Sequence, residues 1–227
     1  PEIQWLCRYM RSMGAKIQGD GTSEIRIQGV KSLSAGCIQV PPDRIVSGTY
    51  ICAAAITRSQ IVLENPPEGE LKAFLEVYRK MGGQYKGNSG KLLVNGKNVQ
   101  SPVKLLETSV YPGFPTDLQS PVMAVLSTIE GESCIREMVF EDRYKAADQL
   151  RKMGARIRVQ GNEAVICGVK TLHGAAVELR GGASLILAAL GAKGVTVLEG
   201  YSFVQRGYEH ICQDLNALGA AVKRIQE

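Results

Sequence analysis

The hydrophobic and polar positions of the 227-residue chain repeat as a unit of fixed order. Four segments have a hydrophobic residue, a glycine and a small or polar residue before an apolar strand: MGAKI at Met13, MGGQY at Met81, MGARI at Met153 and LGAAV at Leu218. Each ends a helical pattern, and the glycine predicts the end of that helix. The spacings of 68, 72 and 65 residues predict about three copies of one folding unit.

After the first three of these segments come two runs of alternating apolar and polar residues, separated by a polar turn. Examples are EIRIQGV, KLLVNGK and EAVICGV. Alternation with a period of two predicts strands with one buried face. The segment GNSGK (87–91) is interpreted as a hairpin turn, because it lacks the spacing of a phosphate-binding loop.

A second kind of helix is apolar almost all round, which is typical of a helix inside a domain. Its three copies are SGTYICAAAI, SPVMAVLSTI and GGASLILAAL, and each is followed by a further strand. The predicted fold class is α/β: an inside-out lobe of pseudo-threefold βαβαββ repeats, with the apolar helices at the centre and the sheets outside. A linear solenoid is the alternative, but its repeats would be shorter and its helices amphipathic.

Charged residues stand just before each apolar helix. They are Asp43 and Arg44, then Asp117, then Glu178 and Arg180. If the three helices run side by side, their N-termini form a platform of unpaired N–H groups, which suits phosphate or carboxylate ligands. We therefore expect the site at this end of the lobe.

The residue patterns alone leave the role of these charges open. Thr116 and Gln119 fit a capping box, and Asp117 is either a helix cap or a catalytic base. Arg180 is either a ligand-binding group or a surface ion-pair partner. Arg206, in VQRGYEHI before an expected amphipathic helix, either clamps a phosphate or is an ordinary exposed arginine.

Composition adds limits on the partners and the compartment. The chain is 44% hydrophobic and carries a net charge of +5, which favours anionic ligands, but no run of Lys and Arg exceeds two residues, so no nucleic-acid partner is expected. The longest apolar stretch is half a membrane span. Six cysteines without CxxC spacing predict buried, reduced thiols and a cytoplasmic protein. His173 and His210 have no metal-ligand spacing.

Five segments in this order resemble the enolpyruvyl transferases: PDRIVSGTYICAAAIT, YPGFPTDLQ, MVFEDRY with LRKMGARI, LRGGASLILAAL, and RGYEHI with LNALGA. Within that family they resemble the branch that acts on UDP-N-acetylglucosamine more than the branch that acts on shikimate 3-phosphate. The resemblance implies transfer of enolpyruvyl from phosphoenolpyruvate to a sugar 3-hydroxyl, in peptidoglycan precursor synthesis, with no metal or organic cofactor.

The resemblance also implies roles for particular residues. Asp117 would act as base or sugar anchor, with Thr116 beside it in the substrate site. Val139 and Phe140 would contact the sugar, and two arginines would hold phosphoenolpyruvate and its developing charge: Arg180 and Arg206. RNA 3′-phosphate cyclase, which shares the repeat, needs a nucleotide-linked histidine, and neither His173 nor His210 has a suitable setting.

Some features of the family are not found in this sequence. The family has two lobes, and its cysteine-bearing loop and N-terminal Lys-Asn pair have no counterpart here; Cys37 in AGCIQV lies at another place in the repeat. Glu178 and Gln205 stand where the family has aspartates. We expect residues 1–42 to end a first lobe and 43–227 to form the second, with the chain inactive without the N-terminal lobe. The alternative is a non-catalytic, half-length ligand-binding or partner protein of the same fold.

The last expectation concerns the third repeat, whose final strand needs a neighbour. The segment Ile25–Val40 has strand–turn–strand character. We expect it to fold against the tail Leu215–Glu227, within the chain or exchanged between two chains as a strand-swapped homodimer.

Overall fold

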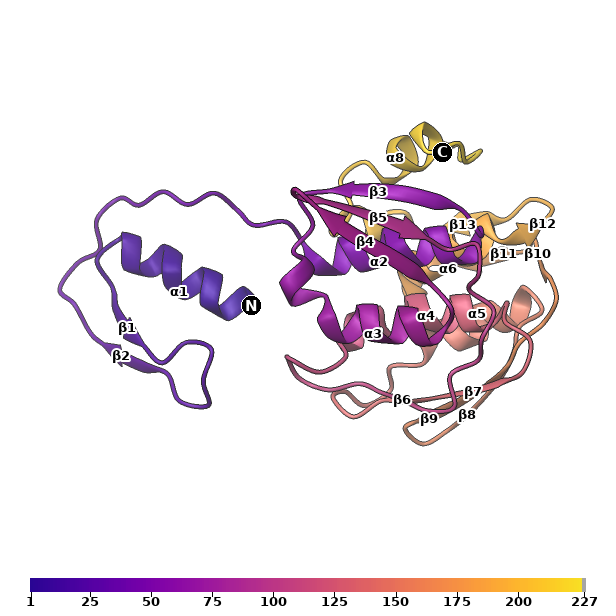
Figure 1. Ribbon diagram of the computed structural model, residues 1–227, viewed down its shortest axis with the longest axis horizontal. Coiled ribbons are helices and arrows are strands. Elements are labelled where there is room, and N and C mark those ends of the chain that lie inside the picture. The colour runs from indigo at the N-terminus through magenta and orange to yellow at the C-terminus, as the bar shows by residue number, and fades with distance from the viewer. Residues whose placement is uncertain (226–227) are drawn as a thin grey trace. The chain divides into compact units, whose positions relative to one another are not determined.

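The computed structural model describes residues 1–225, which divide into two compact units: a first unit of residues 1–42 and a second unit that begins at Asp43 (Figure 1). None of the helices in these residues is both long and apolar enough to cross a lipid bilayer.

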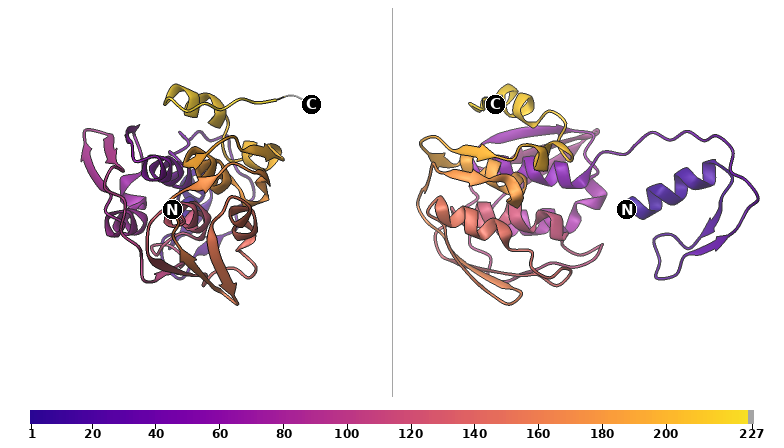
Figure 2. Two further views of the ribbon diagram at one scale, coloured as in Figure 1. Left: turned by 90° about the vertical axis from the view of Figure 1, so that its right-hand side faces the viewer. Right: turned by 180° about the vertical axis from the view of Figure 1, so that it is seen from behind.

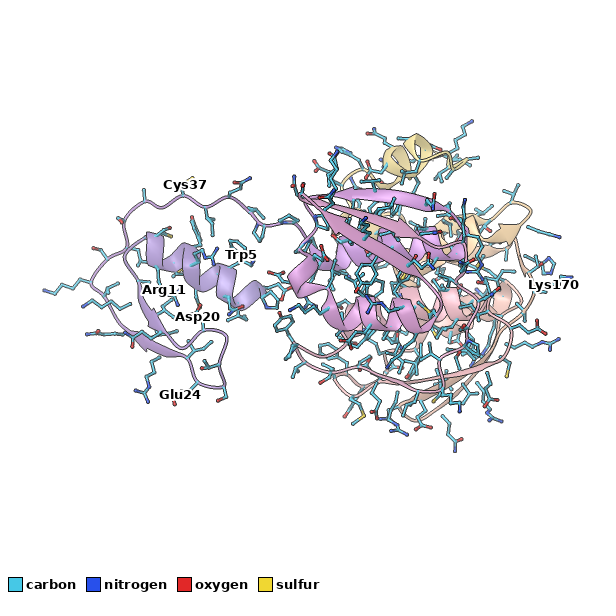
Figure 3. All side chains as sticks on the ribbon, viewed as in Figure 1. Trp5, Arg11, Asp20, Glu24, Cys37 and Lys170 are labelled. Carbon is cyan, nitrogen blue, oxygen red and sulfur yellow. The ribbon has the colours of Figure 1, made fainter. Side chains whose placement is uncertain are left out.

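The first unit has one helix and one hairpin: α1 (Glu2–Ser12), β1 (Lys16–Gln18) and β2 (Arg26–Gln28). The strands pair antiparallel, and Arg11 joins the helix to the hairpin through a hydrogen bond to the Ile17 carbonyl and an ion pair with Asp20 (Figure 3). All of β2 is exposed, including Ile27 at 71%. Its direct partner in β1, Ile17, is buried at 7%, so one apolar side chain of the pair is covered and the other is open.

The second unit begins with two repeats of the same order. The first contains α2 (Arg44–Ile56), β3 (Gln60–Glu64), η1 (Glu68–Glu70), α3 (Lys72–Lys80), β4 (Gln84–Asn88) and β5 (Lys91–Asn95). The second contains β6 (Leu106–Glu107), η2 (Thr116–Leu118), α4 (Gln119–Leu126), β7 (Glu132–Arg136), α5 (Lys145–Lys152), β8 (Arg156–Gln160) and β9 (Glu163–Cys167). Their sheets have matching orders, β3-β5-β4 and β7-β9-β8, with β6 added parallel to β7.

The third repeat forms two small sheets where the first two repeats each form one larger sheet. It consists of β10 (Leu172–His173), β11 (Ala176–Glu178), η3 (Leu179–Gly181), α6 (Ala183–Leu190), β12 (Ala192–Lys193), β13 (Val197–Glu199), α7 (Ser202–Gln205) and α8 (Ile211–Ala217). Its strands form two parallel pairs, β10 with β12 and β11 with β13. In place of one amphipathic helix, two short helices flank Arg206, so the expected helix begins later than RGYE.

The three apolar helices α2, α4 and α6 pack against one another at the centre of the unit, with the sheets outside (Figures 1 and 2). They run in the same direction. Gly48 near the start of α2 lies against Leu118 before α4, while at the other end Arg58 donates to the Thr128 carbonyl (3.3 Å) and Gly191 lies against Ile56. The predicted inside-out α/β lobe is confirmed, and the three helix N-termini gather at one end.

The repeated glycines have one conformation. Gly14, Gly82, Gly154 and Gly219 all have φ between +90° and +98°, each just after its helix. A residue with a Cβ is strained in this left-handed region, so glycine allows the chain to leave the helix. The sequence signature of the repeat is thus the C-terminal cap of its surface helix.

The contact between α2 and α4 is tight enough to test. A Cβ on Gly48 would clash with Leu118 Cδ1, and Leu118 is fully buried. We predict that Gly48→Val lowers the free energy of unfolding by about 1 to 3 kcal/mol, because overpacking forces shifts in a close-packed core. Urea denaturation of this variant measures the effect. The control, Gly69→Val in exposed η1, has open space at its Cβ and should change stability by about 0.5 kcal/mol or less.

Two expectations need correction. All six cysteines are free, but the expected burial holds only for Cys7 and Cys52, since Cys37 and Cys167 are exposed and the other two are half-buried. The segment 25–40 pairs through β2 with β1, whereas residues 221–225 of the tail form no strand. The expected final strand is thus not found in residues 221–225, and residues 226–227 lie outside the described residues. Pairing of the segment with the tail, within the chain or exchanged between two chains, stays a prediction.

Candidate functional site

The candidate site is built where β7 ends and α4 begins. Leu118 is buried at the junction of η2 and α4, which leaves the side chain of Asp117 at the surface, 54% exposed. Pro121 is the third residue of α4, where its missing N–H costs no intrahelical bond. Neither η2 nor α4 has a side-chain cap, so the capping interpretation of Asp117 and the Thr116–Gln119 capping box are wrong.

Instead of capping, the Asp117 carboxylate forms an ion pair with Arg143. The Arg143 guanidinium also lies over the Phe140 ring, 5.2 Å from its centre, a cation–π arrangement. One arginine therefore joins the expected base to the expected sugar-contacting loop. Asp43, by contrast, is the N-cap of α2, since its side chain accepts from the Ile45 and Val46 N–H groups.

A buried carboxylate lies beneath this pair. Glu137 is only 2% exposed, and its oxygens accept hydrogen bonds from the Thr108 and Thr116 hydroxyls at 2.8 Å each. They also accept from the backbone N–H groups of Val139 (2.9 Å) and Phe140 (3.1 Å). Burial raises the pKa of Glu137, but these hydrogen bonds outweigh it and hold the pKa below its ordinary value.

This shift has a consequence for stability at acid pH. A carboxyl with a lowered pKa in the folded state stabilises the protein above its ordinary pKa, and this contribution is lost as the pH falls through the folded value. We predict that Glu137→Gln destabilises the protein by about 2 kcal/mol at pH 7, and that the difference from wild type shrinks below about pH 4.5. Urea denaturation between pH 3 and pH 7 measures it.

The exposed neighbour Glu141 provides the control for this measurement. Glu141→Gln should follow the wild-type stability curve throughout. A difference between wild type and Glu137→Gln that stays constant with pH would mean that Glu137 is not held as a carboxylate.

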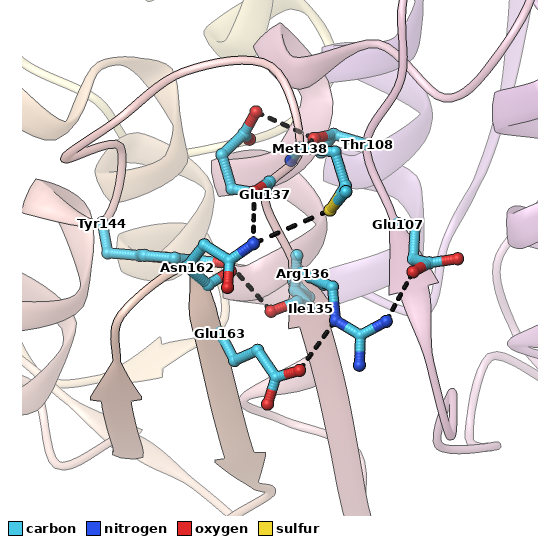
Figure 4. A network of polar contacts seen from close by, with 9 residues as sticks. All are labelled: Glu107, Thr108, Ile135, Arg136, Glu137, Met138, Tyr144, Asn162 and Glu163. Atoms are coloured by element: carbon cyan, nitrogen blue, oxygen red, sulfur yellow. Dashed lines mark hydrogen bonds and ion pairs between the residues drawn. The ribbon is translucent and has the colours of Figure 1, made fainter.

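The loop 138–140, between β7 and the segment that leads into α5, is fixed from several sides. The Met138 N–H donates to Thr108 Oγ1 (2.8 Å), and Asn162 Nδ2 donates to the Glu137 carbonyl (3.1 Å; Figure 4). Tyr144 donates to the Ile135 carbonyl, and burial raises its pKa to about 12. Residues 137–144 with Gly161 and Asn162 line a pocket of about 410 Å³.

The two expected phosphoenolpyruvate arginines lie around α7. Arg180 in η3 pairs with Glu178 (3.2 Å) and lies 6.0 Å from the centre of the Phe203 ring, while Arg206 follows α7 directly. Tyr208 connects this region to the helix N-termini. It shares a hydrogen bond of 2.7 Å with Thr49 of α2, and its pKa is raised by burial and by the charges of Asp43 and Asp117.

The structure thus brings Thr116, Asp117, Val139 and Phe140 together. It places Arg180 in η3 and Arg206 directly after the neighbouring helix α7. Sequence reasoning missed Glu137 and Arg143. Glu137 had a signal, because it continues the inward phase of Ser133 and Ile135 along β7, where a charge is unexpected. Its inward position could have indicated a polar network.

Comparisons with known proteins show what the chain as a whole is similar to. The family model described as EPSP synthase (3-phosphoshikimate 1-carboxyvinyltransferase) matches residues 1–215. A relative named UDP-N-acetylglucosamine 1-carboxyvinyltransferase 2, from Caldanaerobacter subterraneus subsp. tengcongensis, is 41% identical over 99% of this chain and 55% of its own length. A UDP-N-acetylglucosamine 1-carboxyvinyltransferase from Desulfofundulus thermocisternus is 43% identical over 96% of this chain and 91% of its own.

Solved structures give the same picture of the fold. The enolpyruvyl transferase NikO from Streptomyces tendae matches 98% of this chain and 54% of its own, with a TM-score of 0.85 at 26% identity. EPSP synthase from Acinetobacter baumannii matches with a TM-score of 0.71 at 20% identity, a likeness of fold. The chain spans about 55% of the length of the first two curated relatives that it matches.

Proposed function

The chain belongs to the EPSP synthase family of enolpyruvyl transferases, and from this we propose that it supplies the second lobe of an enzyme that transfers enolpyruvyl from phosphoenolpyruvate to the 3-hydroxyl of UDP-N-acetylglucosamine. Residues 1–42 belong in this proposal to the end of the first lobe, and residues from 43 onward to the second. The relatives named above support the choice of acceptor, since they carry the name of that sugar nucleotide.

One observation carries the proposal. Asp117 is a half-exposed carboxylate at the start of a buried helix, and Arg143 ties it to the loop that holds Val139 and Phe140. A base and a surface for the acceptor are thereby held together. A carboxylate that only capped the helix would instead accept from the backbone N–H groups of α4, as Asp43 does for α2.

The proposed chemistry uses these groups directly. The sugar hydroxyl oxygen bonds to the phosphate-bearing carbon of phosphoenolpyruvate while Asp117 takes the hydroxyl proton, and the methylene carbon gains a proton from solvent water. Loss of a proton from the resulting methyl group to solvent water and departure of phosphate then restore the double bond in the product. Arg180 and Arg206 bind the phosphate and carboxylate charges of phosphoenolpyruvate and stabilise the phosphate as it departs. No step requires a metal or organic cofactor.

The biological setting is part of the same proposal. Transfer to UDP-N-acetylglucosamine begins the synthesis of peptidoglycan precursors, so the enzyme would serve cell wall biogenesis, cell shape and cell division. Both substrates are water-soluble metabolites, which fits a cytoplasmic location. Nucleic acid and membrane are not partners in this reaction.

Binding of the sugar nucleotide tests the proposal independently of turnover. Isothermal titration calorimetry of the protein with UDP-N-acetylglucosamine should show saturable binding. UDP-glucose should bind with much lower affinity. Binding without transfer, in protein expressed from its complete coding sequence, would favour the non-catalytic ligand-binding alternative. Absence of binding would contradict both.

A variant of the loop sharpens this test. We predict that Phe140→Ala weakens UDP-N-acetylglucosamine binding about fivefold, because the ring contributes about 1 kcal/mol through its contacts and its stacking with Arg143. The control is Leu93→Ala on β5, a similarly exposed apolar side chain on another sheet, which should bind like wild type. Equal affinities for wild type and Phe140→Ala would remove the loop from the acceptor site.

A further inference from the structure

The two segments expected to contact the acceptor are far apart in the sequence but share one buried group. Thr116 lies in η2, directly before Asp117, and Val139 and Phe140 lie more than twenty residues later. We propose that Glu137 is a positioning residue, which locks the Asp117 turn (η2) and the loop 138–140 into one rigid acceptor site. This inference rests on the proposed function for its catalytic part.

The two carboxylate oxygens divide the contacts between the segments. Oε2 accepts from the Thr116 hydroxyl, whereas Oε1 accepts from Thr108 Oγ1 and from the N–H groups of Val139 and Phe140. Because the carboxylate is planar and rigid, a shift of η2 moves the acceptor of the loop as well. The two segments therefore cannot change position independently.

The surroundings hold Glu137 firmly. Thr108, which donates to Glu137, also accepts from the Met138 N–H. On the other side Asn162 donates to the Glu137 carbonyl, and the Asn162 carbonyl accepts from Tyr144 Oη at 2.9 Å (Figure 4). The network thus runs from the end of β6 through Glu137 to the turn between β8 and β9. It connects the loop to the strands that flank β7 on either side, β6 and β9.

Burying a charged side chain at this position costs more free energy than burying an apolar one. An ionised carboxylate at 2% exposure loses its hydration, and an apolar residue of similar size would serve packing at lower cost. The four donors compensate the charge, and all four come from segments that the site uses or from Thr108 beneath them. The arrangement fits a group whose function is to fix these segments.

The first part of the test needs no substrate. Amide hydrogen exchange is measured in wild type, Glu137→Ala and Glu137→Gln. In Glu137→Ala we expect exchange to rise about tenfold or more both at Val139 and Phe140 and at Leu118 and Gln119 in the turn. Glu137→Gln keeps one acceptor oxygen but presents an amide to Thr116, so its rates should lie between the other two.

The matched control is Glu163→Ala. Glu163 lies at the start of β9 and its carboxylate pairs with Arg136 (2.7 Å; Figure 4), whereas the donors of the two segments bond to Glu137. It should leave exchange at all four amides unchanged. Thr116→Val removes only the hydrogen bond to Glu137 Oε2, so it should speed amide exchange in the turn more than in the loop. Faster exchange at only one segment in Glu137→Ala would overturn the coupling.

The second part measures transfer kinetics in protein expressed from its complete coding sequence. Misplaced groups cost on the order of tenfold to a hundredfold in rate, so Glu137→Gln should lower kcat and raise the KM for UDP-N-acetylglucosamine, each about tenfold per folded molecule. The KM for phosphoenolpyruvate should stay within about twofold, since Arg180 and Arg206 lie on other elements.

The outcomes separate this inference from the proposed function. Activity that falls only with the folded fraction, with both KM values unchanged, would make Glu137 a structural residue and overturn the inference. A wild-type protein that transfers nothing would overturn the proposed function, and with it the effect of Glu137 on the transfer reaction. The amide hydrogen exchange experiment then tests, without any substrate, whether Glu137 couples the two segments. If Glu137→Ala does not fold, Glu137→Gln carries both measurements.

Discussion

Asp117→Asn is expected to lower kcat about a hundredfold or more while the fold survives, because an amide cannot take the proton of the sugar hydroxyl. The side chain is half-exposed at the surface of the site and fills no core space, so its replacement by an isosteric amide leaves the packing of Leu118 and α4 intact. Steady-state phosphate release, normalised to folded protein by circular dichroism, measures the loss.

Asp148 offers a matched control for this variant. It is an exposed aspartate of α5 that pairs with Arg151, and it does not line the pocket of the site. Asp148→Asn should retain wild-type activity. Near-normal turnover of Asp117→Asn would reduce Asp117 to a structural partner of Arg143, without a role in the chemistry.

Arg206→Ala is expected to raise the KM for phosphoenolpyruvate about thirtyfold, because it removes a charge-assisted hydrogen-bonding group of about 2 kcal/mol. The KM for UDP-N-acetylglucosamine should change little, since Val139, Phe140 and Asp117 belong to another part of the site. Initial rates measured over a matrix of both substrate concentrations separate the two constants.

The control is Arg224→Ala in the same unit. Arg224 is exposed and its guanidinium lies over the Tyr201 ring at 4.8 Å, so the variant loses a comparable charge near α7. It should keep both KM values. An unchanged KM for phosphoenolpyruvate in Arg206→Ala would return Arg206 to an ordinary surface arginine.

The repeat and its central helices could be predicted from the sequence because their signals are local. A glycine after Met13, Met81 and Met153 marks the end of each helix, and the structure gives each glycine a left-handed conformation. Helices that are apolar all round can only be buried, which places them at the centre of the lobe. The gathering of their N-termini follows from three parallel copies of one unit.

The connections within the site could not be predicted in the same way. The pairs Asp117–Arg143 and Thr116–Glu137 join residues more than twenty positions apart, and no spacing rule links them. For Asp117 the local pattern leaves a cap and a catalytic base open, whereas in the structure its carboxylate pairs with Arg143 and caps neither η2 nor α4. Around Arg206 the short helix α7 was missed, because its four residues give no periodic signal.

The proposed reaction is tested most directly by offering two acceptors to protein expressed from its complete coding sequence. The enzyme is incubated with phosphoenolpyruvate and either UDP-N-acetylglucosamine or shikimate 3-phosphate, and products are identified by mass spectrometry alongside phosphate release. We predict an enolpyruvyl adduct of UDP-N-acetylglucosamine with an equal amount of phosphate, and no adduct of shikimate 3-phosphate. Transfer to shikimate 3-phosphate alone, or to neither acceptor, would contradict the proposed function.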